Sequence, residues 1–383
     1  IYFFTAFMNN KIVIIGSTGV LGRKLLTYLK KNNRNVDLIT CYSNQNKLLV
    51  QKKLSKARHA LVLNTQIKNS IKELNYGDLF LIEYIKSNPI SILYILNTGF
   101  TSLKYIDLVI KFQKKCTIAI ANKEILVAGG KLLVNKILDS SNYFLPLDSE
   151  HFSLINLLPD RNLINKYISK IYLTASGGPF YFNKKFNIKN VNLKMATHHP
   201  IWKMGYKNTI DSSNLVNKVL ECFELSALYN FPLSKIGITI SPKAFAHSVV
   251  FYKDHRISIN CFLNDMMIPM TSPFVNNSFY KAPNNNISIL SDKNFKFIEF
   301  NNKKFQILKF YQRILTFNHV QQINFMILNA EAVNRFIHNK IYYKDIIPFI
   351  FNNIERFPKR KNFKNLYEII NYTNKVSLGI NKL

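Results

Sequence analysis

A buried strand that runs straight into a glycine-rich turn is the feature that most constrains the fold of this chain. Residues 11–15 read Lys-Ile-Val-Ile-Ile, and this β-branched run predicts a strand covered on both faces. Residues 16–22 read Gly-Ser-Thr-Gly-Val-Leu-Gly and lead into a predicted helix over 23–31. Because glycine permits close backbone approach and a helix N-terminus presents free N–H groups, this context predicts a loop that binds dinucleotide phosphates. The spacing is Gly-x-x-Gly-x-x-Gly, not the commoner Gly-x-Gly-x-x-Gly, so the motif alone leaves other interpretations open.

The residues after the second predicted strand, 36–40, indicate which dinucleotide fits. Cys41, Tyr42, Ser43 and Asn44 follow that strand, and none is the acidic residue with which an NAD enzyme binds the ribose 2′-hydroxyl. Hydroxyl and amide groups suit a 2′-phosphate better. The sequence therefore favours NADPH as the cofactor.

Further alternation of strands and helices predicts a parallel sheet. Apolar runs at 92–96 and 117–121 are predicted strands, and the second delivers Asn122, Lys123 and Glu124 to its carboxyl end. Ligands bind at that edge of open parallel sheets. Lys123 could equally be a solvated lysine at the start of a helix.

Three carboxylates in two short motifs form a candidate metal site. Asp148 and Glu150 are two residues apart, so on an extended segment they share one face while Ser149 points the other way. A second motif places an amide, an amine and a carboxylate at i, i+1 and i+4 of one predicted helix: Asn217, Lys218 and Glu221. Oxygen ligands suit Mg²⁺ or Mn²⁺ better than Zn²⁺. For either motif alone, a surface turn or an ordinary helix charge is the alternative.

Two hydroxyl groups in the same region can contact a phosphate. Residues 172–179 predict a strand that enters a Ser-Gly-Gly turn at Ser176, where a hydroxyl and exposed amides can bind phosphate. Ser212, or its neighbour, is the predicted N-cap of the helix that carries Asn217.

The segment 197–205 predicts a mobile, partly apolar loop. It holds the chain's only tryptophan, Trp202, between Pro200 and Gly205. A rigid surface loop anchored by Trp202 is the alternative.

These patterns predict an α/β protein with several domains. We expect a Rossmann-like NADPH-binding domain over 8–147 and an α+β catalytic domain with a mobile lid loop over 148–276. A linker over 277–304 and a C-terminal helical bundle over 305–383 follow. Met8 directly precedes the first strand, so we expect it to be the physiological start.

Composition indicates a globular protein and does not by itself assign a partner. The 383 residues are 48% hydrophobic, which suffices for substantial cores. The net charge of +31 comes with a chain-wide excess of Lys, Asn, Ile, Tyr and Phe, all residues of adenine- and thymine-rich codons. We therefore expect no nucleic-acid partner.

Location is predicted from the same composition. The longest uncharged stretches are not apolar enough to span a membrane, so we expect no membrane partner, and the four cysteines form no Cys-x-x-Cys pair. We expect a cytoplasmic protein of a bacterium with a reduced genome, such as an endosymbiont, with a plastid-type organelle as the alternative.

The ordered motifs resemble one enzyme family over essentially the whole chain. They are G-S-T-G-x-x-G at 16–22, A-N-K-E at 121–124, P-x-D-S-E-H at 146–151, S-G-G-P-F at 176–180, H-P-x-W-x-M-G at 199–205, D-S-x-x-x-x-N-K-x-x-E at 211–221 and H-S at 247–248. This set is similar to that of the 1-deoxy-D-xylulose 5-phosphate reductoisomerases. The resemblance implies a homodimer that uses NADPH and Mg²⁺ or Mn²⁺ to convert 1-deoxy-D-xylulose 5-phosphate to 2-C-methyl-D-erythritol 4-phosphate in non-mevalonate isoprenoid synthesis.

The resemblance also implies a role for each matching residue. Three carboxylates would bind the metal: Asp148, Glu150 and Glu221. Substrate oxygens and the substrate phosphate would be bound by a second set: Lys123, Ser149, Glu150, Ser176, His199, Ser212, Asn217, Lys218 and Glu221. The cofactor would be bound by a third set: Thr18, Gly19, Val20, Leu21, Ser43, Asn44, Asn122, Glu124 and Gly205. The loop around Trp202 would close over bound substrate.

Four departures from the family pattern bear on the cofactor more than on the metal. Val20 replaces a usual Ser, Tyr42 a usual Gly, and Ile201 a usual Asn, while residues 241–243 read Ser-Pro-Lys in place of His-Pro-Gln. None of these is a metal or phosphate ligand, so we expect activity to be retained.

Two other functions stay open at this point. One is an NADP-dependent oxidoreductase that uses only the chemistry of the first domain, and the other is a basic nucleic-acid-binding protein on a degenerate enzyme scaffold. A hydride-only dehydrogenase needs no site of three carboxylates, and a nucleic-acid-binding protein would show salt-dependent affinity for duplexes.

The absence of an acidic residue after the second strand makes a prediction about cofactor choice. NADPH should be preferred to NADH by at least about tenfold in kcat/KM, or roughly 1.4 kcal/mol. Steady-state rates with each cofactor measure this ratio. Equal use of both would mean that Tyr42 has remade the pocket.

Overall fold

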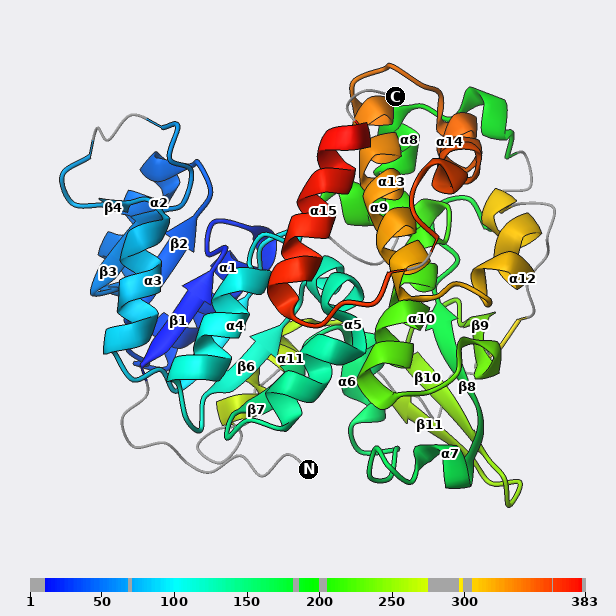
Figure 1. Ribbon diagram of the computed structural model, residues 1–383, viewed down its shortest axis with the longest axis horizontal. Helices are drawn as coiled ribbons and strands as arrows, with labels where there is room; N and C mark the ends of the chain where they lie inside the picture. The colour runs from blue at the N-terminus through cyan, green and yellow to red at the C-terminus, as the bar shows by residue number, and fades with distance from the viewer. Residues whose placement is uncertain are drawn as a thin grey trace. The chain divides into compact units, whose positions relative to one another are not determined.

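The chain forms two compact units, each built around its own sheet (Figure 1). The computed structural model describes residues 11–67, 71–181, 186–199, 205–274, 296–298, 305–359 and 361–380. Of these, the first unit takes residues 11–125, 132–152 and 265–274, and the second takes the others.

The first unit contains the predicted parallel sheet. Seven strands lie in the order β4-β3-β2-β1-β5-β6-β7, and every neighbouring pair is parallel. The strands are β1 (Ile12–Ile15), β2 (Leu38–Cys41), β3 (His59–Val62), β4 (Asn75–Tyr76), β5 (Ile92–Ile95), β6 (Thr117–Ile120) and β7 (Tyr143–Pro146). All four residues of β1, β2, β5 and β6 are buried, as a strand covered on both faces requires. The α/β interpretation and the strands expected at 11–15, 92–96 and 117–121 are thus confirmed.

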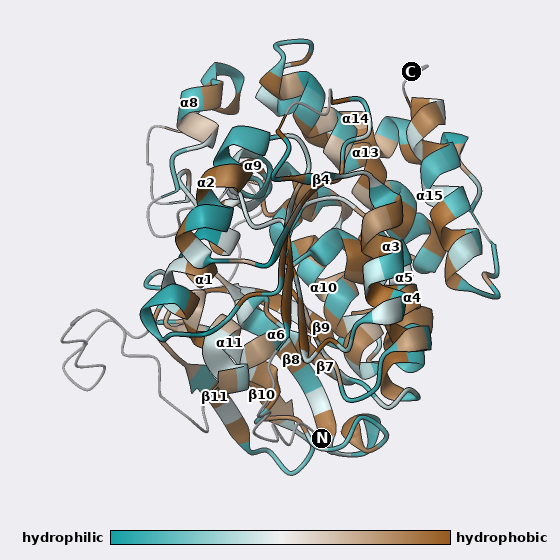
Figure 2. Cartoon of the chain, turned by 90° about the vertical axis from the view of Figure 1, so that its left-hand side faces the viewer, coloured by the Kyte–Doolittle hydropathy of each residue, from teal (hydrophilic) through white to brown (hydrophobic). Residues whose placement is uncertain are grey.

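The helices of this unit follow the strands in the βα order expected of a Rossmann-like sheet. They are α1 (Val20–Lys31), α2 (Gln45–Ser55), α3 (Asp78–Ser87), α4 (Leu103–Phe112), α5 (Lys123–Leu138) and α6 (Ser149–Leu154), with α11 (Met267–Thr271) later in the chain. Figure 2 shows hydrophobic strands in the interior and hydrophilic residues on α1 and α2. In α1 the buried residues Gly22, Leu25, Leu26 and Leu29 recur at helical spacing, so one stripe of the helix packs on the sheet.

Helix α1 begins three residues before the predicted start, at Val20 instead of Arg23. Gly22 therefore lies in the first helical turn and not in the loop. A Cβ added at Gly22 would lie 2.5 Å from both Cα and O of Ser17. The absence of a side chain is what lets the first turn of α1 rest on the end of β1.

The second unit is organised around a mixed sheet in the order β11-β10-β8-β9. β10 pairs antiparallel with β8 and β11, while β8 and β9 are parallel. The strands are β8 (Ile168–Ala175), β9 (Ile236–Ile240), β10 (Ala246–Tyr252) and β11 (Ile257–Cys261). The strand expected to enter the turn at Ser176 is therefore present as β8.

Helices complete the second unit. They are α7 (Ile164–Tyr167), α8 (Leu193–Ala196), α9 (Tyr206–Ser213), α10 (Val216–Tyr229), α12 (Tyr311–Ile314), α13 (His319–Ile337), α14 (Ile346–Asn353) and α15 (Leu366–Ile380). α13 contacts α14, α15 and α9. The C-terminal helical region expected from residue 305 is confirmed, while the exact domain boundaries stay predictions.

Several expectations lie partly or wholly outside the described residues. Met8 does, and so does the predicted linker 277–304 apart from residues 296–298. Within the described part of the chain, no helix has the length and hydropathy needed to cross a bilayer.

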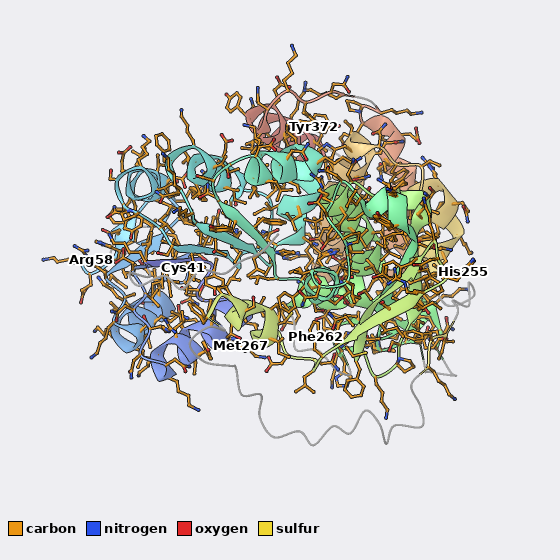
Figure 3. The ribbon with its side chains drawn as sticks, turned by 90° about the horizontal axis from the view of Figure 1, so that it is seen from below. Cys41, Arg58, His255, Phe262, Met267 and Tyr372 are labelled. Atoms are coloured by element: carbon orange, nitrogen blue, oxygen red, sulfur yellow. The ribbon has the colours of Figure 1, made fainter. Side chains whose placement is uncertain are left out.

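The cysteines are free thiols: Cys41, Cys116, Cys222 and Cys261. Figure 3 shows Cys41 inside the first unit and the side chain of Arg58 at its surface. Burial raises the pKa of the Cys41 thiol to about 11, so this group stays protonated and unreactive at neutral pH.

Replacing Gly22 tests the close approach of α1 to β1. We expect Gly22→Ala to lower the free energy of unfolding by about 1–3 kcal/mol, because the new methyl group meets backbone that cannot move aside. Gly19→Ala is the matched control, since its Cβ would be 3.4 Å from the nearest atom, Gly16 O. Urea unfolding of both variants measures the difference, and equal stabilities would contradict the packing described here.

Candidate active site

Four loops at the carboxyl edge of the parallel sheet carry the predicted site residues of the first unit. They follow β1, β2, β6 and β7. Their predicted site residues are Thr18, Gly19, Val20, Leu21, Ser43, Asn44, Asn122, Lys123, Glu124, Asp148, Ser149 and Glu150. Because carboxyl ends of parallel strands meet at one edge, the sheet topology gathers residues far apart in sequence on one side of this unit.

The glycine turn after β1 is shaped for an anion. Gly16 has a φ of +92°, and a Cβ there would be 2.6 Å from the backbone N of Asn97, so only glycine fits. Helix α1 begins after Gly19 without a side-chain cap. Thr18, Val20 and Leu21 are half-buried, and Gly19 is exposed. An uncapped helix N-terminus beside a glycine turn suits a pyrophosphate.

The loop after β2 is open to solvent. Ser43 and Asn44 are exposed, and Asn44 Oδ1 accepts a hydrogen bond of 3.1 Å from the Lys47 amide as the N-cap of α2. Tyr42, which stands where the family usually has Gly, is 70% exposed. A large apolar ring directly beside the two candidate 2′-phosphate contacts is the main departure of this loop from the family pattern.

Lys123 is buried, so the interpretation as a solvated helix-start lysine is wrong. Only 6% of it is exposed, and its Nζ lies 3.1 Å from Asp148 Oδ2. Asn122 caps α5 by accepting a hydrogen bond from the Ile125 amide, and its Nδ2 donates to the Asn97 carbonyl over 2.8 Å. Glu124 is also buried, at 5% exposure. The three polar residues that follow β6 are therefore all buried.

The backbone at Asp148 and Glu150 differs from the prediction. These residues were expected on an extended segment, but Asp148 lies on a bend and Ser149 begins α6. Ser149 Oγ donates a 2.6 Å hydrogen bond to Glu150 Oε2. The alternation of faces in a strand does not apply, because the chain turns into a helix directly after β7.

In the second unit, α10 presents the other predicted motif as expected. Asn217 Nδ2 donates to Glu221 Oε1, which confirms the i, i+4 pair. Lys218 Nζ lies 2.6 Å from Glu221 Oε2, and the side chains of Lys218 and Glu221 are 6% and 1% exposed. A carboxylate so deeply buried needs such partners to stay ionised.

Ser176 opens the predicted glycine turn at the end of β8. Gly177 and Gly178 both have positive φ values, of 89° and 61°. Ser176 Oγ lies 3.3 Å from His199 Nε2. A Cβ at Gly178 would lie 3.0 Å from the Ser212 carbonyl oxygen, so this turn packs directly on the end of α9.

Ser212 was expected, with its neighbour, to cap the helix that carries Asn217, and this is wrong. It lies in the last turn of α9, and α10 begins only at Val216. Asn214 Oδ1 accepts from the Val216 amide over 3.0 Å instead. A separate helix, α9, ends at Ser213. Gly205 is the exposed N-cap of α9.

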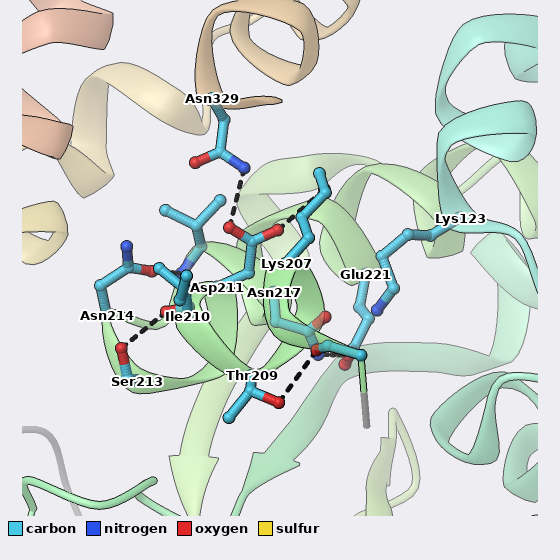
Figure 4. A network of polar contacts seen from close by, with 12 residues as sticks. Lys123, Lys207, Thr209, Ile210, Asp211, Ser213, Asn214, Asn217, Glu221 and Asn329 are labelled. Atoms are coloured by element: carbon cyan, nitrogen blue, oxygen red, sulfur yellow. Dashed lines mark hydrogen bonds and ion pairs between the residues drawn. The ribbon is translucent and has the colours of Figure 1, made fainter. Parts of the chain in front are cut away.

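A buried carboxylate holds α9 in place and was missed from the sequence. Asp211 is fully buried, accepts a 2.9 Å hydrogen bond from Asn329 Nδ2 on α13, and pairs with Lys207 Nζ at 2.9 Å (Figure 4). Ser213 Oγ and Tyr343 Oη lie 2.9 Å apart. The acidic residue before Ser212 was the available signal, but its partner on α13 lies 118 residues away.

The imidazole of His199 is held neutral. Partial burial lowers its pKa to about 4, with the positive charges of Lys218 and His198 as smaller causes. Pro200, Ile201 and Trp202 lie outside the described residues, so the lid loop stays a prediction.

Two family models match the chain across both units. The 1-deoxy-D-xylulose 5-phosphate reductoisomerase model matches residues 12–130, and that of the C-terminal domain of the same family matches residues 144–229. A 1-deoxy-D-xylulose 5-phosphate reductoisomerase of Pelagibacter ubique (strain HTCC1062) is 33% identical, over 97% of this chain and 99% of its own. The chain belongs to the 1-deoxy-D-xylulose 5-phosphate reductoisomerase family. A relative of the same name from Wolbachia pipientis wMel is 31% identical over 94% of each chain.

Solved structures of the family share the fold. A DOX-P reductoisomerase in complex with NADPH, fosmidomycin and magnesium matches with a TM-score of 0.85, 25% identity and 97% coverage of both chains. The reductoisomerase from Zymomonas mobilis in complex with NADPH has a TM-score of 0.82 at 24% identity, over 97% of this chain and 98% of that one.

The low pKa of His199 makes a prediction about pH. The folded protein should keep this imidazole neutral down to about pH 4, whereas the unfolded chain binds the proton near 6.5, so stability should fall as the pH drops from 6.5 towards 4. NMR titration of the His199 Cε1 proton, assigned with His199→Gln, measures the midpoint. Lys218→Met should raise it, and a midpoint near 6.5 in the parent would contradict the burial described here.

Proposed function

We propose that this protein rearranges and reduces 1-deoxy-D-xylulose 5-phosphate to 2-C-methyl-D-erythritol 4-phosphate, with NADPH and Mg²⁺ or Mn²⁺, in isoprenoid precursor synthesis. The observation that carries the proposal is that the two proposed substrate lysines are buried beside proposed metal ligands. Both substrate lysines, Lys123 and Lys218, are about 5–6% exposed, and each is paired with a proposed metal carboxylate.

The first unit fits a bound dinucleotide. The Gly16 turn and the uncapped start of α1 suit the pyrophosphate, and Ser43 and Asn44 suit the 2′-phosphate. No acidic side chain lies between Cys41 and Asn44 to repel that phosphate. Asn122 and Glu124 are the other proposed cofactor contacts of this unit, and the exposed Gly205 of the second unit belongs to the same proposed set.

The donor set fits a hard divalent cation. Asp148, Glu150 and Glu221 offer only carboxylate oxygens, which Mg²⁺ and Mn²⁺ prefer. A bound cation would act as a Lewis acid, stabilising negative charge on the substrate oxygens during the carbon–carbon rearrangement. Lys123 and Lys218 balance the charge of Asp148 and Glu221. A bound cation would take over that role, and both amines would then be available to substrate oxygens.

The second unit supplies the proposed phosphate contacts. Ser176 lies in a turn with two positive-φ glycines, and this turn packs against Ser212. Asn217 and Lys218 stand in the first turn of α10. A neutral His199 can donate a hydrogen bond to a phosphate oxygen without the cost of a buried charge, and the loop that follows it would exclude water when closed.

The proposal extends to the homodimer and to a cytoplasmic location. The family resemblance supports the dimer, and the four free thiols fit a reducing compartment. An oxidoreductase that lacks the rearrangement step is the competing function. It is disfavoured because the buried Lys218–Glu221 pair would then have no catalytic use.

A single assay tests the activity. NADPH oxidation should depend on both the deoxyxylulose phosphate and Mn²⁺, and chelation of the metal should abolish it. Glu221→Gln should lower kcat by at least about 1000-fold, because it removes a ligand charge that stabilises the transition state. NADPH binding should be nearly unchanged, since the glycine turn belongs to the other unit.

The matched control for that variant is Glu331→Gln, which removes another paired carboxylate of the second unit, 2.7 Å from Arg335. It should keep parental turnover. An unchanged rate for Glu221→Gln at saturating Mn²⁺ would overturn the metal assignment.

A further inference from the structure

We propose that Gln51 is a positioning residue for the cofactor-binding glycine turn. Gln51 lies in α2, is 8% exposed, and makes a reciprocal pair of hydrogen bonds with Ser17 of that turn. Its Nε2 donates to the Ser17 carbonyl over 2.9 Å. Ser17 Oγ can donate to Gln51 Oε1 at 2.8 Å or to the Thr40 carbonyl at 3.0 Å. The two ends of the Gln51 side chain therefore contact the carbonyl and the hydroxyl of one turn residue.

Ser17 is the part of the turn whose position decides where the neighbouring amides point. It is fully buried, and its amide donates to the Thr40 carbonyl over 2.9 Å. Its carbonyl oxygen also lies against Gly22, where a Cβ would come within 2.5 Å. Without Gln51, this carbonyl would be a buried acceptor deprived of its side-chain donor, and such groups are costly. The turn would relax to reach another donor.

The same helix also carries the other end of the proposed cofactor site. α2 begins at Gln45, directly after Ser43 and its N-cap Asn44, the candidate 2′-phosphate contacts. Gln51 lies within two turns of that N-terminus and faces the glycine turn. One rigid helix thus fixes the distance between the pyrophosphate-binding turn and the 2′-phosphate loop. We infer that Gln51 sets cofactor affinity without touching the cofactor.

This inference rests on the proposed use of NADPH, and its test separates the two. Gln51→Met keeps the length of the side chain and removes both hydrogen bonds. NADPH binding is measured directly by nucleotide fluorescence, without substrate or metal, and steady-state rates are measured beside it. We expect Kd and KM for NADPH to rise about tenfold or more, with kcat and the substrate KM changed less than about threefold.

A second buried glutamine of the same unit provides the matched control. Gln113 is 7% exposed, accepts from the Ile90 amide over 2.8 Å and donates to the Asn88 carbonyl over 2.9 Å, away from the glycine turn. Gln113→Met should lower the melting temperature as Gln51→Met does, yet leave NADPH affinity at the parental value. A purely structural role for Gln51 predicts that the two variants weaken NADPH binding equally, and that result would overturn the proposal.

Gln51→Glu keeps the proposal testable if Gln51→Met folds poorly. It retains an acceptor for Ser17 Oγ and loses the donor, so it should weaken NADPH binding as well. In a double-mutant cycle, Ser17→Ala combined with Gln51→Met should lose less NADPH affinity than the sum of the two single losses, because the two side chains share a hydrogen bond. Additive losses would overturn the proposed route.

Comparing the affinities for NADPH and NADH distinguishes an effect on the glycine turn from an effect on the 2′-phosphate loop. Gln51 variants should weaken both nucleotides by the same factor, whereas Asn44→Ala should weaken NADPH alone. If the parent protein binds NADPH but does not convert the sugar phosphate, the proposed function is wrong and this inference still holds. If the parent protein binds no NADPH, both are wrong.

Discussion

The close packing of helix α1 on the end of strand β1 is the constraint on which the first unit depends. It leaves no room for a side chain at Gly22, which faces Ser17. The chain that follows β5 leaves none at Gly16, which faces the Asn97 backbone. The backbone of the turn between them is therefore tightly constrained, and α1 begins without a side-chain cap. Ser17 and Gln51 are joined by hydrogen bonds on the buried side of this turn. In the proposed function, buried groups that do not contact the cofactor fix the shape of the turn that would bind its phosphates.

The second unit depends on a comparable junction between α9 and α10. Leu215 links the two helices with a φ of 68°, an uncommon conformation for a side chain of this size. Such a conformation persists only where surrounding contacts fix it. Asp211 supplies them on one side, through Asn329 on α13 and Lys207. The C-terminal helices therefore contribute to the site by holding the turn that carries Ser212 and Asn217, although they offer no predicted ligand of their own.

Each unit contains a buried lysine–carboxylate pair. Lys123 lies 3.1 Å from Asp148, and Lys218 lies 2.6 Å from Glu221. In each pair the opposite charge offsets the cost of burying an ionised side chain away from water. The chain's net charge of +31 does not bear on this arrangement, because the surface lysines come with a general enrichment of Lys and Asn. The two lysines with proposed roles in catalysis, Lys123 and Lys218, are both buried.

Local sequence patterns were enough to predict the main elements and the residue types of the candidate site. The β-branched run at 11–15, the glycine turn and the spacing of Asn217 and Glu221 predicted a parallel sheet, a strand–turn–helix junction and a pair of polar side chains on one helix face, because these patterns are local and their periods differ. Phosphate binding by that turn stays a prediction. The tertiary structure was needed to show where Asp148 bends into α6, that Ser212 ends one helix instead of capping the next, and that Lys123 is buried. It also revealed Gln51 and Asp211, whose partners lie 34 and 118 residues away. Local patterns report which face of an element is apolar, whereas burial and hydrogen-bond partners depend on which distant segments pack against it.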